Sequence, residues 1–154
     1  MKYNDSIKWI WYDFNQLSTQ TLYDILKLRQ DIFIVEQKVY YEDIDGVDLH
    51  SKHLIGTIGK EVIATLRLLP VDLFAKGYIS FGRFVVKKKY RGNKIGDLMM
   101  QTLMHSINQN NTVYPIKISA QHYLVNFYGR YGFKTIGEPY IEDLVKHIAM
   151  IRKI

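Results

Sequence analysis

Hydrophobic residues recur along this chain with two different spacings, and segments of the two kinds follow one another. Short runs rich in β-branched and aromatic residues predict strands at residues 7–14, 52–59, 60–70, 78–86, 113–121, 133–143 and 146–154. Spacings of three and four residues predict helices at residues 18–37, 96–107 and 122–132. We therefore expect a mixed α/β domain in the order strand, helix, three strands, helix, strand, helix and two strands.

The first predicted helix carries charge on its apolar face. Steps of four and three residues place one set of positions on the same side: Leu22, Leu26, Arg29, Phe33 and Glu36. A buried charge without a partner is costly, so Arg29 and Glu36 must be paired or hydrated. Two interpretations are possible: a buried structural ion-pair network, or a cavity in which Glu36 faces an acceptor amine as base or anchor.

Composition narrows the class of protein. The 154 residues suit one domain spanning 1–154, with 47% hydrophobic and 23% charged residues. The sequence has no cysteine and shows no signal-peptide pattern or apolar run of membrane-spanning length, so we expect a cytoplasmic protein. A net charge of +6 favours anionic partners, but it does not distinguish nucleic acid from acidic peptides or phosphorylated small molecules.

The segment FVVKKKYRGNKIGDLMM, residues 84–100, joins a predicted strand to a predicted helix through a basic turn that contains glycine. A loop at the start of a helix exposes backbone N–H groups at the positive end of the helix, where a phosphate is stabilised. Gly92 and Gly96 would let an anion approach the backbone, and Arg91 and Lys94 add positive charge. These features suit a pyrophosphate, although an ordinary helix start with a hydrated basic turn shows the same pattern.

Two motifs in this region resemble the GNAT superfamily of N-acetyltransferases. FGRFVVKKKYRGNKIGDLMM is similar to the acetyl-CoA-binding segment of that family, and NFYGRYGF is similar to the aromatic segment that follows the family's next strand. The segments LRQDIFIVEQ, YYEDIDGVD, ATLRLLP, AQHYLVNFY and HIAM resemble the ElaA-like subgroup, so the resemblance covers nearly the whole chain. It implies the GNAT fold, a central, mostly antiparallel, twisted sheet of about seven strands with helices on both faces.

The resemblance also implies a site and a reaction. Acetyl-CoA would be the cosubstrate, an acetyl group would pass directly to a primary amine of a small molecule or peptide, and Tyr128 would protonate the departing thiolate. A backbone N–H near Val85 would stabilise the oxyanion, and a base, with Glu36 as a candidate, would deprotonate the amine. The implied acetyl-CoA contacts are Phe84, Val85, Val86, Arg91, Gly92, Asn93, Lys94, Ile95, Gly96 and Gln121.

The chain departs from the family pattern at several positions. Lys94 stands where the superfamily has its first loop glycine, so a left-handed backbone there would strain this residue. Gln121 and Leu124 stand where many members have Asn and Ala, which weakens the expected pantetheine contact at Gln121. Residues 142–150 lack the Gly and Pro of the subgroup's turn before the last strand, which puts the shape of that turn in doubt.

Acidic residues and histidines cluster between the first predicted helix and the next strand. The members of the cluster are Asp43, Asp45, Asp48, His50 and His53. Three interpretations are open: a hydrated acidic loop, a surface that recognises a cationic substrate, or a metal site. The cluster lacks the ligand spacing of a calcium loop, and we expect no metal.

Other functions fit parts of the sequence. LRQDIFIVEQ and LRLLP also resemble acyl-homoserine lactone synthases, which use an acyl-carrier donor and S-adenosylmethionine, whereas the complete phosphate loop favours CoA. Tyr128 shares a helical face with Leu124, Phe127 and Tyr131, so it would also suit a core position with a satisfied hydroxyl. A non-catalytic acyl-CoA-binding module is a further alternative. A single lysine run without a recognised nucleic-acid motif disfavours nucleic acid, and the acceptor, the base and the oligomeric state stay open.

Overall fold

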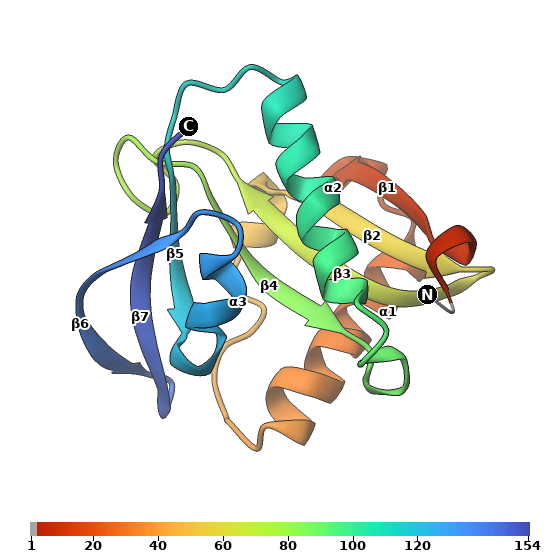
Figure 1. The fold of residues 1–154 in the computed structure, drawn as a ribbon. Helices are drawn as coiled ribbons and strands as arrows, with labels where there is room; N and C mark the ends of the chain where they lie inside the picture. Colours follow the sequence, from red (N-terminus) through yellow and green to blue (C-terminus); the bar gives the residue numbers. More distant parts are fainter. Residues whose placement is uncertain (1–2) are drawn as a thin grey trace.

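Strands and helices follow one another in the predicted order in the computed structural model, which describes residues 3–154 (Figure 1). The strands are β1 (Lys8–Asp13), β2 (Lys52–Ile58), β3 (Glu61–Leu69), β4 (Ser80–Val86), β5 (Ile116–Gln121), β6 (Lys134–Glu142) and β7 (Val145–Arg152). The α-helices are α1 (Thr19–Arg29), α2 (Ile95–Gln109) and α3 (Val125–Gly129). Each element overlaps its predicted segment, so the mixed α/β class is confirmed. No helix in this described part of the chain is long and apolar enough to cross a membrane.

The seven strands form two antiparallel sheets that meet at one edge of each. β1 to β4 form a meander in which each strand pairs with the next one. β7 pairs with both β5 and β6, which gives a second sheet in the order β5-β7-β6. Within residues 3–154 the bridge that joins the two sheets is a parallel one between Ile79 and Ile116. Beyond this bridge β4 and β5 share no ladder among the described residues.

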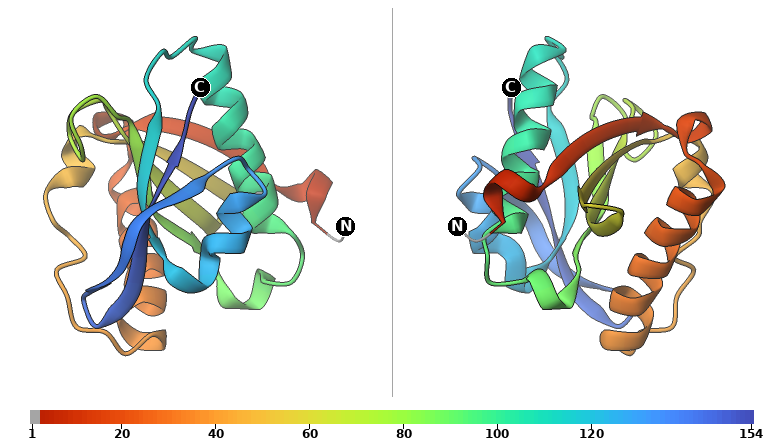
Figure 2. Two further views of the ribbon diagram at one scale, coloured as in Figure 1. Left: turned by 60° about the vertical axis from the view of Figure 1, so that its left-hand side comes forward. Right: turned by 90° about the vertical axis from the view of Figure 1, so that its right-hand side faces the viewer.

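Helices cover both faces of the sheets, as the sequence predicts. Figures 1 and 2 show α2 and α3 on one face and α1 on the other. From α2, the apolar side chains of Ile95, Met99 and Leu103 are buried in the larger core. From α1, Ile25 and Leu28 are buried in a smaller core on the opposite face. The burial of this apolar surface from water is the main favourable term that fixes the layers.

The helix that begins at Thr19 changes type at its midpoint. Residues after α1 continue as a π-helix, η3 (Gln30–Glu36), in which the N–H of Gln37 bonds to the carbonyl of Ile32 five residues earlier. Because a π-helix has more residues in each turn than an α-helix, a different set of residues faces the core after Arg29. The buried positions of this segment are Ile25, Leu28, Arg29, Ile32 and Phe33. The predicted stripe is therefore correct for Arg29 and Phe33, whereas Leu22, Leu26 and Glu36 are only partly buried.

Candidate active site

The loop before α2 has the backbone geometry that an anion site requires. β4 ends at Val86, a 3-10 turn covers Lys88–Tyr90, and α2 begins at Ile95. Gly92 has φ +78°, and Lys94 has φ 58° and ψ 22°. Lys94 therefore adopts the left-handed conformation that glycine adopts most easily, and the expectation of strain at this position is confirmed. The loop leads directly into the N-terminal turn of α2, where N–H groups lack partners within the helix.

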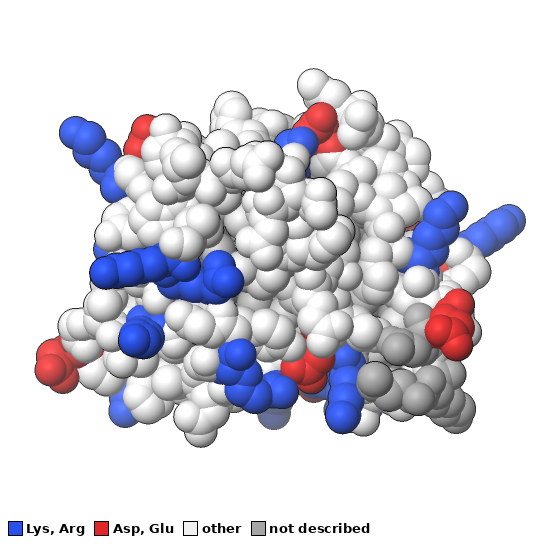
Figure 3. Space-filling model, turned by 45° about the horizontal axis from the view of Figure 1, so that its top comes forward, with Lys and Arg blue, Asp and Glu red and all other residues white. Residues whose placement is uncertain are grey.

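The lysine run before this loop is partly neutralised. Nζ of Lys87 lies 2.7 Å from a carboxylate oxygen of Glu61, and Nζ of Lys89 lies 2.8 Å from the same oxygen. The Tyr90 hydroxyl also donates to Glu61, and these hydrogen bonds lower the pKa of Glu61 to about 2. In the face that Figure 3 shows, Lys and Arg stand at separated positions with uncharged surface between them. The run therefore presents less free positive charge than its sequence indicates.

Arg91 and Glu36, both predicted site residues, bind each other. The guanidinium donates two hydrogen bonds to the Glu36 carboxylate, at 2.8 Å and 2.7 Å, and its Nε donates to the Val86 carbonyl at 3.0 Å. This pairing lowers the pKa of Glu36. A general base works best with a pKa near the working pH and an unoccupied lone pair. In this arrangement Glu36 ties η3 to the phosphate loop, and the geometry favours a positioning role for it.

Tyr128 lies inside an aromatic cluster on the α2 side of the sheet. Its side chain is 5% exposed and its ring centroid lies 5.2 to 6.3 Å from those of Phe81, Phe84, Phe127 and Phe133. Burial raises the pKa of this tyrosine, so the hydroxyl keeps its proton at neutral pH. Within residues 3–154 the structure gives the hydroxyl no hydrogen-bond partner. This oxygen is not one of the described fully buried atoms that lack a partner, so the hydroxyl reaches space that solvent or a ligand can enter.

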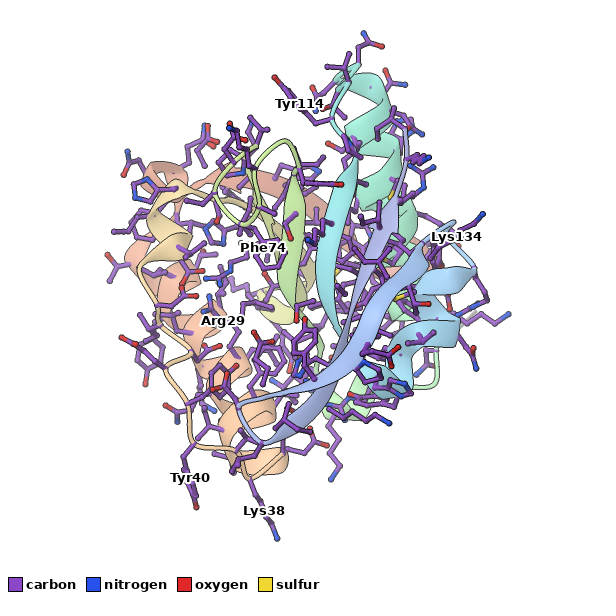
Figure 4. All side chains as sticks on the ribbon, turned by 90° about the vertical axis from the view of Figure 1, so that its left-hand side faces the viewer. Arg29, Lys38, Tyr40, Phe74, Tyr114 and Lys134 are labelled. Carbon is purple, nitrogen blue, oxygen red and sulfur yellow. The ribbon has the colours of Figure 1, made fainter. Side chains whose placement is uncertain are left out.

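The acidic loop after η3 is folded into a buried ion-pair network. We call this the arginine–aspartate network, and its members are Arg29, Asp43, Asp45, Asp48, Arg67 and Arg83. Arg29, only 1% exposed, donates from Nη1 to Asp48 at 2.7 Å and from Nε to Asp43 at 2.9 Å. Arg67 binds Asp45 at 2.7 Å. Figure 4 shows Arg29 extending from α1 toward the strands, whereas Lys38 and Tyr40 point outward.

The network contradicts one of the three interpretations of this loop at its buried positions. Asp43, Asp48 and His53 are buried, so a hydrated acidic loop is wrong for these positions, while His50 is exposed. The carboxylates of Asp43 and Asp48 face arginines of the same chain, because charges removed from water need close partners, whereas Asp45 binds Arg67 and Arg83 from an exposed position. Within the described residues no group of three or more His, Cys, Asp or Glu side chains is arranged to hold a metal ion.

Arg83 is a strained residue that sequence reasoning missed. Val85 pairs with Thr65 and Gly82 with Arg67, so β4 carries one extra residue in this interval, a β-bulge. Arg83 lies in the bulge with φ 50°. Its Nε is 2.8 Å from Oδ1 of Asp43, and its guanidinium lies 5.3 Å from the Tyr41 ring centroid. The network thus holds a left-handed residue immediately before Phe84, the first predicted acetyl-CoA contact.

A second group of residues that sequence reasoning missed lies on the sheet formed by β5, β7 and β6. Gln121, a predicted pantetheine contact at the end of β5, pairs with His147 of β7, which in turn pairs with Tyr140 of β6. Nε2 of Gln121 lies 3.5 Å from Oε1 of Gln37, the residue directly after η3. The side chain of Gln121 therefore lies on the same side of the molecule as α1, which covers the first sheet. No spacing in the sequence indicates the group, because it forms only when β7 inserts between β5 and β6.

The fold and the loop together define a class of proteins. The family profile described as acetyltransferase (GNAT) domain matches residues 33–154. The chain therefore belongs to the GNAT acetyltransferase family, which confirms the prediction from its motifs.

Within that family the chain is similar to ElaA proteins. Protein ElaA of Escherichia coli K12 is 35% identical over 150 residues, which cover 96% of this chain and 97% of that protein. A UPF0039 protein of Synechocystis is also 35% identical over 150 residues, with 96% of both chains covered. The crystal structure of an acyl-CoA N-acyltransferase from Pseudomonas aeruginosa superposes with a TM-score of 0.89 at 35% identity, covering 96% of this chain and 99% of that chain. The predicted ElaA-like resemblance is confirmed.

A more distant likeness bears on the alternative function. The acyl-homoserine lactone synthase LasI shares the fold with a TM-score of 0.75, covering 96% of this chain and 88% of that chain. At 15% sequence identity this likeness shows the fold alone.

Proposed function

We propose that the protein is an acetyl-CoA-dependent N-acetyltransferase that transfers the acetyl group directly to a primary amine. The observation that carries the proposal is the loop from Gly92 to Gly96, in which two left-handed residues bring the backbone to the positive end of α2. A pyrophosphate there is stabilised by N–H groups and by the exposed ammonium of Lys94. A GNAT acetyltransferase from Elizabethkingia anophelis, described with acetyl-CoA bound, shares the fold with a TM-score of 0.64 at 14% identity.

The acyl arm fits between the two sheets. β4 and β5 share no ladder beyond the Ile79–Ile116 bridge, so the backbone from Phe84 to Val86 and at Gln121 can pair with a ligand instead of with each other. An N–H near Val85 then lies beside the thioester carbonyl and stabilises the oxyanion as the amine attacks. One such donor is worth about 3 kcal/mol in a dry site. In this proposal Tyr128, which keeps its proton, donates it to the departing thiolate.

Gly96 offers a sharp test of the loop. A Cβ added at Gly96 would lie 3.7 Å from the rings of Phe84 and Phe127, an ordinary contact, so Gly96→Ala should fold and bind acetyl-CoA nearly as well as the wild type. Gly96→Glu adds length and negative charge at the proposed pyrophosphate site. Calorimetry should show steeply weakened acetyl-CoA binding for Gly96→Glu alone, at an unchanged far-UV spectrum. Equal, wild-type affinity in both variants would reduce the loop to an ordinary helix start.

The reaction itself is tested by an acceptor screen. Acetyl-CoA is incubated with a library of small amines, amino acids and peptides, and free thiol release is recorded. A parallel arm supplies an acyl-carrier-protein thioester with S-adenosylmethionine, the substrate pair of the lactone synthases. Amine-dependent thiol release from acetyl-CoA supports the proposal, and product formation in the parallel arm alone contradicts it. Tight acetyl-CoA binding without turnover in either arm would favour the non-catalytic binding module.

A further inference from the structure

Polar side chains from three strands meet on the face of the second sheet that α2 does not cover. They are Ser119 of β5, Tyr140 and Glu142 of β6, and His147 of β7. Their neighbours Ile118, Ala120, Ile148 and Met150 are buried in the core on the α2 side. Because successive side chains of a strand point to opposite faces, Ser119 and His147 lie on the other side. We call these four residues the His147 cluster.

Hydrogen bonding fixes the orientation of the imidazole. Nδ1 of His147 lies 2.8 Å from the carbonyl oxygen of Val145, and a carbonyl only accepts, so Nδ1 carries a proton. In the neutral ring Nε2 is then the atom with the lone pair. This atom lies 3.5 Å from Oε2 of Glu142, at the long end of an ion pair. Two acceptors facing each other at this distance require a proton between them or a donor from a ligand.

The rest of the cluster holds these two groups in place. Ser119 Oγ donates to Oε2 of Glu142 at 3.0 Å and is also hydrogen-bonded to the Tyr140 hydroxyl. The Tyr140 ring stacks on the imidazole at 6.2 Å with an interplanar angle of 17°. The histidine is 9% exposed, whereas Glu142 and Tyr140 reach solvent. Ser119 contacts the carboxylate and not the imidazole, so the arrangement is not that of an activated serine nucleophile.

The cluster stands beside the proposed path of the acyl arm. His147 is the direct partner of Gln121 across the β5–β7 ladder, and Gln121 is the predicted pantetheine contact. Glu36 is held by Arg91 on both carboxylate oxygens. Nε2 of His147, by contrast, makes no hydrogen bond within the described residues.

We propose that His147, supported by Glu142, is the base that deprotonates the acceptor amine, which binds as an ammonium ion attracted by the Glu142 carboxylate. The inference rests on the proposed function. One proton passes from the ammonium nitrogen to Nε2, and the freed lone pair forms the C–N bond to the thioester carbonyl carbon while the C–S bond breaks. As the amide forms, Tyr128 gives its hydroxyl proton to the thiolate, and the second proton lost by the nitrogen returns through solvent to restore the Tyr128 hydroxyl. The net proton released is the one held by His147.

Two small amines of similar size test this role. Ethylamine is almost fully protonated at neutral pH, whereas 2,2,2-trifluoroethylamine is largely neutral because its fluorines withdraw electron density. His147→Gln should lower the rate with ethylamine about 10²–10⁴-fold and the rate with trifluoroethylamine much less, because the second amine needs no base before attack. Glu142→Gln should show the same preference with a smaller loss. His105→Gln, at an exposed position of α2, is the matched control and should match the wild type with both amines.

Binding and stability measurements separate the outcomes. Acetyl-CoA affinity by calorimetry and the melting temperature should change little in His147→Gln. An equal loss with both amines, or no loss with ethylamine, would overturn the base assignment while leaving acetyl transfer intact. If the wild type binds acetyl-CoA but acetylates no amine of the acceptor library, direct transfer to an amine fails first and the role of His147 fails with it.

Discussion

Lys94 carries a positive charge and has a left-handed backbone conformation that is unfavourable for residues other than glycine. A side chain in the left-handed region costs about 1 kcal/mol relative to glycine, and Lys94 has φ 58°. We predict that Lys94→Gly raises the melting temperature by about 2–4 °C while weakening acetyl-CoA binding, since the substitution removes both the strain and the ammonium. Differential scanning calorimetry and titration calorimetry measure the two effects. Lys88→Gly removes a charge from the same loop without relieving strain, so a higher melting temperature in that variant too would contradict the explanation.

The substitution Tyr128→Phe distinguishes a catalytic role of the hydroxyl from a packing role of the ring. Tyr128→Phe keeps the ring among its four phenylalanine neighbours. Because the hydroxyl has no partner to lose among residues 3–154, the melting temperature should change little. The maximal rate should fall about 10²-fold, the low end for a general acid, since a thiolate leaves easily and burial has raised the pKa of the tyrosine. Single-turnover thiol release measures this, and an unchanged rate with chemistry limiting would remove the acid role.

At the scale of elements, the arginine–aspartate network connects α1, the loop before β2, β3 and the bulge of β4. Asp48 accepts from both Arg29 and Arg67 in the buried part of the network. We predict that Asp48→Asn lowers the free energy of unfolding by about 3–5 kcal/mol, because two buried arginines lose a compensating charge. Urea unfolding measures the change.

Asp31 provides the matched control for this substitution. It forms an exposed pair with Lys27 one helical turn away, at 2.6 Å. Pairs of this kind contribute about 0.3–0.5 kcal/mol, so Asp31→Asn should be almost neutral. Similar, small effects of the two substitutions would show that the network is less important to the fold than its burial indicates.

Local sequence patterns predicted the elements better than their junctions. The boundaries of β2 and β3 follow from runs of apolar residues that are buried on both faces, and those of α2 follow from helical spacing because this helix buries one face. The π-helix was not predicted, since the residues from Gln30 to Glu36 are compatible with an α-helix and the wider turn depends on the surfaces they pack against. The bulge at Arg83 and the insertion of β7 between β5 and β6 depend on pairing across strands, which no local window contains.

The candidate site likewise has parts that the sequence predicted and parts that it did not. The phosphate loop is continuous in sequence, so its motif and even the strain at Lys94 were predictable. The arginine–aspartate network joins residues up to 40 positions apart, and the sequence showed only that Arg29 needed a partner. The His147 cluster joins three strands and left no signal at all in the hydrophobic pattern.

For the molecule as a whole, the network predicts the response to acid. Burial raises the pKa of Asp45 and of Asp48, but hydrogen bonds and charge from the arginines outweigh it, and both pKa values lie below normal. A carboxylate with a lowered folded-state pKa stabilises the fold above its unfolded pKa, about 3.9 for Asp, and this contribution is lost as pH falls through the folded value. We therefore expect the contribution of the network to stability to be level from pH 7 to about pH 5 and to fall below about pH 4. Burial lowers the pKa of His53, so this residue makes the fold less stable as pH falls below about 6.5.

Urea unfolding at a series of pH values measures this profile. Asp48→Asn should be less stable at pH 7 and should lose less on acidification, because one of the titrating groups is absent. A wild-type profile that stays level to pH 3 would contradict the assignment.

The π-helix also has a consequence for how this chain can change over evolutionary time. The end of η3 presents Glu36 to Arg91 on the phosphate loop and Gln37 to Gln121 on β5, so one turn of backbone aims two side chains at opposite borders of the proposed acyl-CoA site. Losing a single residue between 30 and 36 while the wider winding persists would turn Glu36 and Gln37 away from Arg91 and Gln121. Substitutions that keep the length of the segment leave the directions of the Glu36 and Gln37 side chains unchanged. Length rather than composition is then the inherited property here, and alignments of related sequences should show many exchanges across this stretch but no gaps.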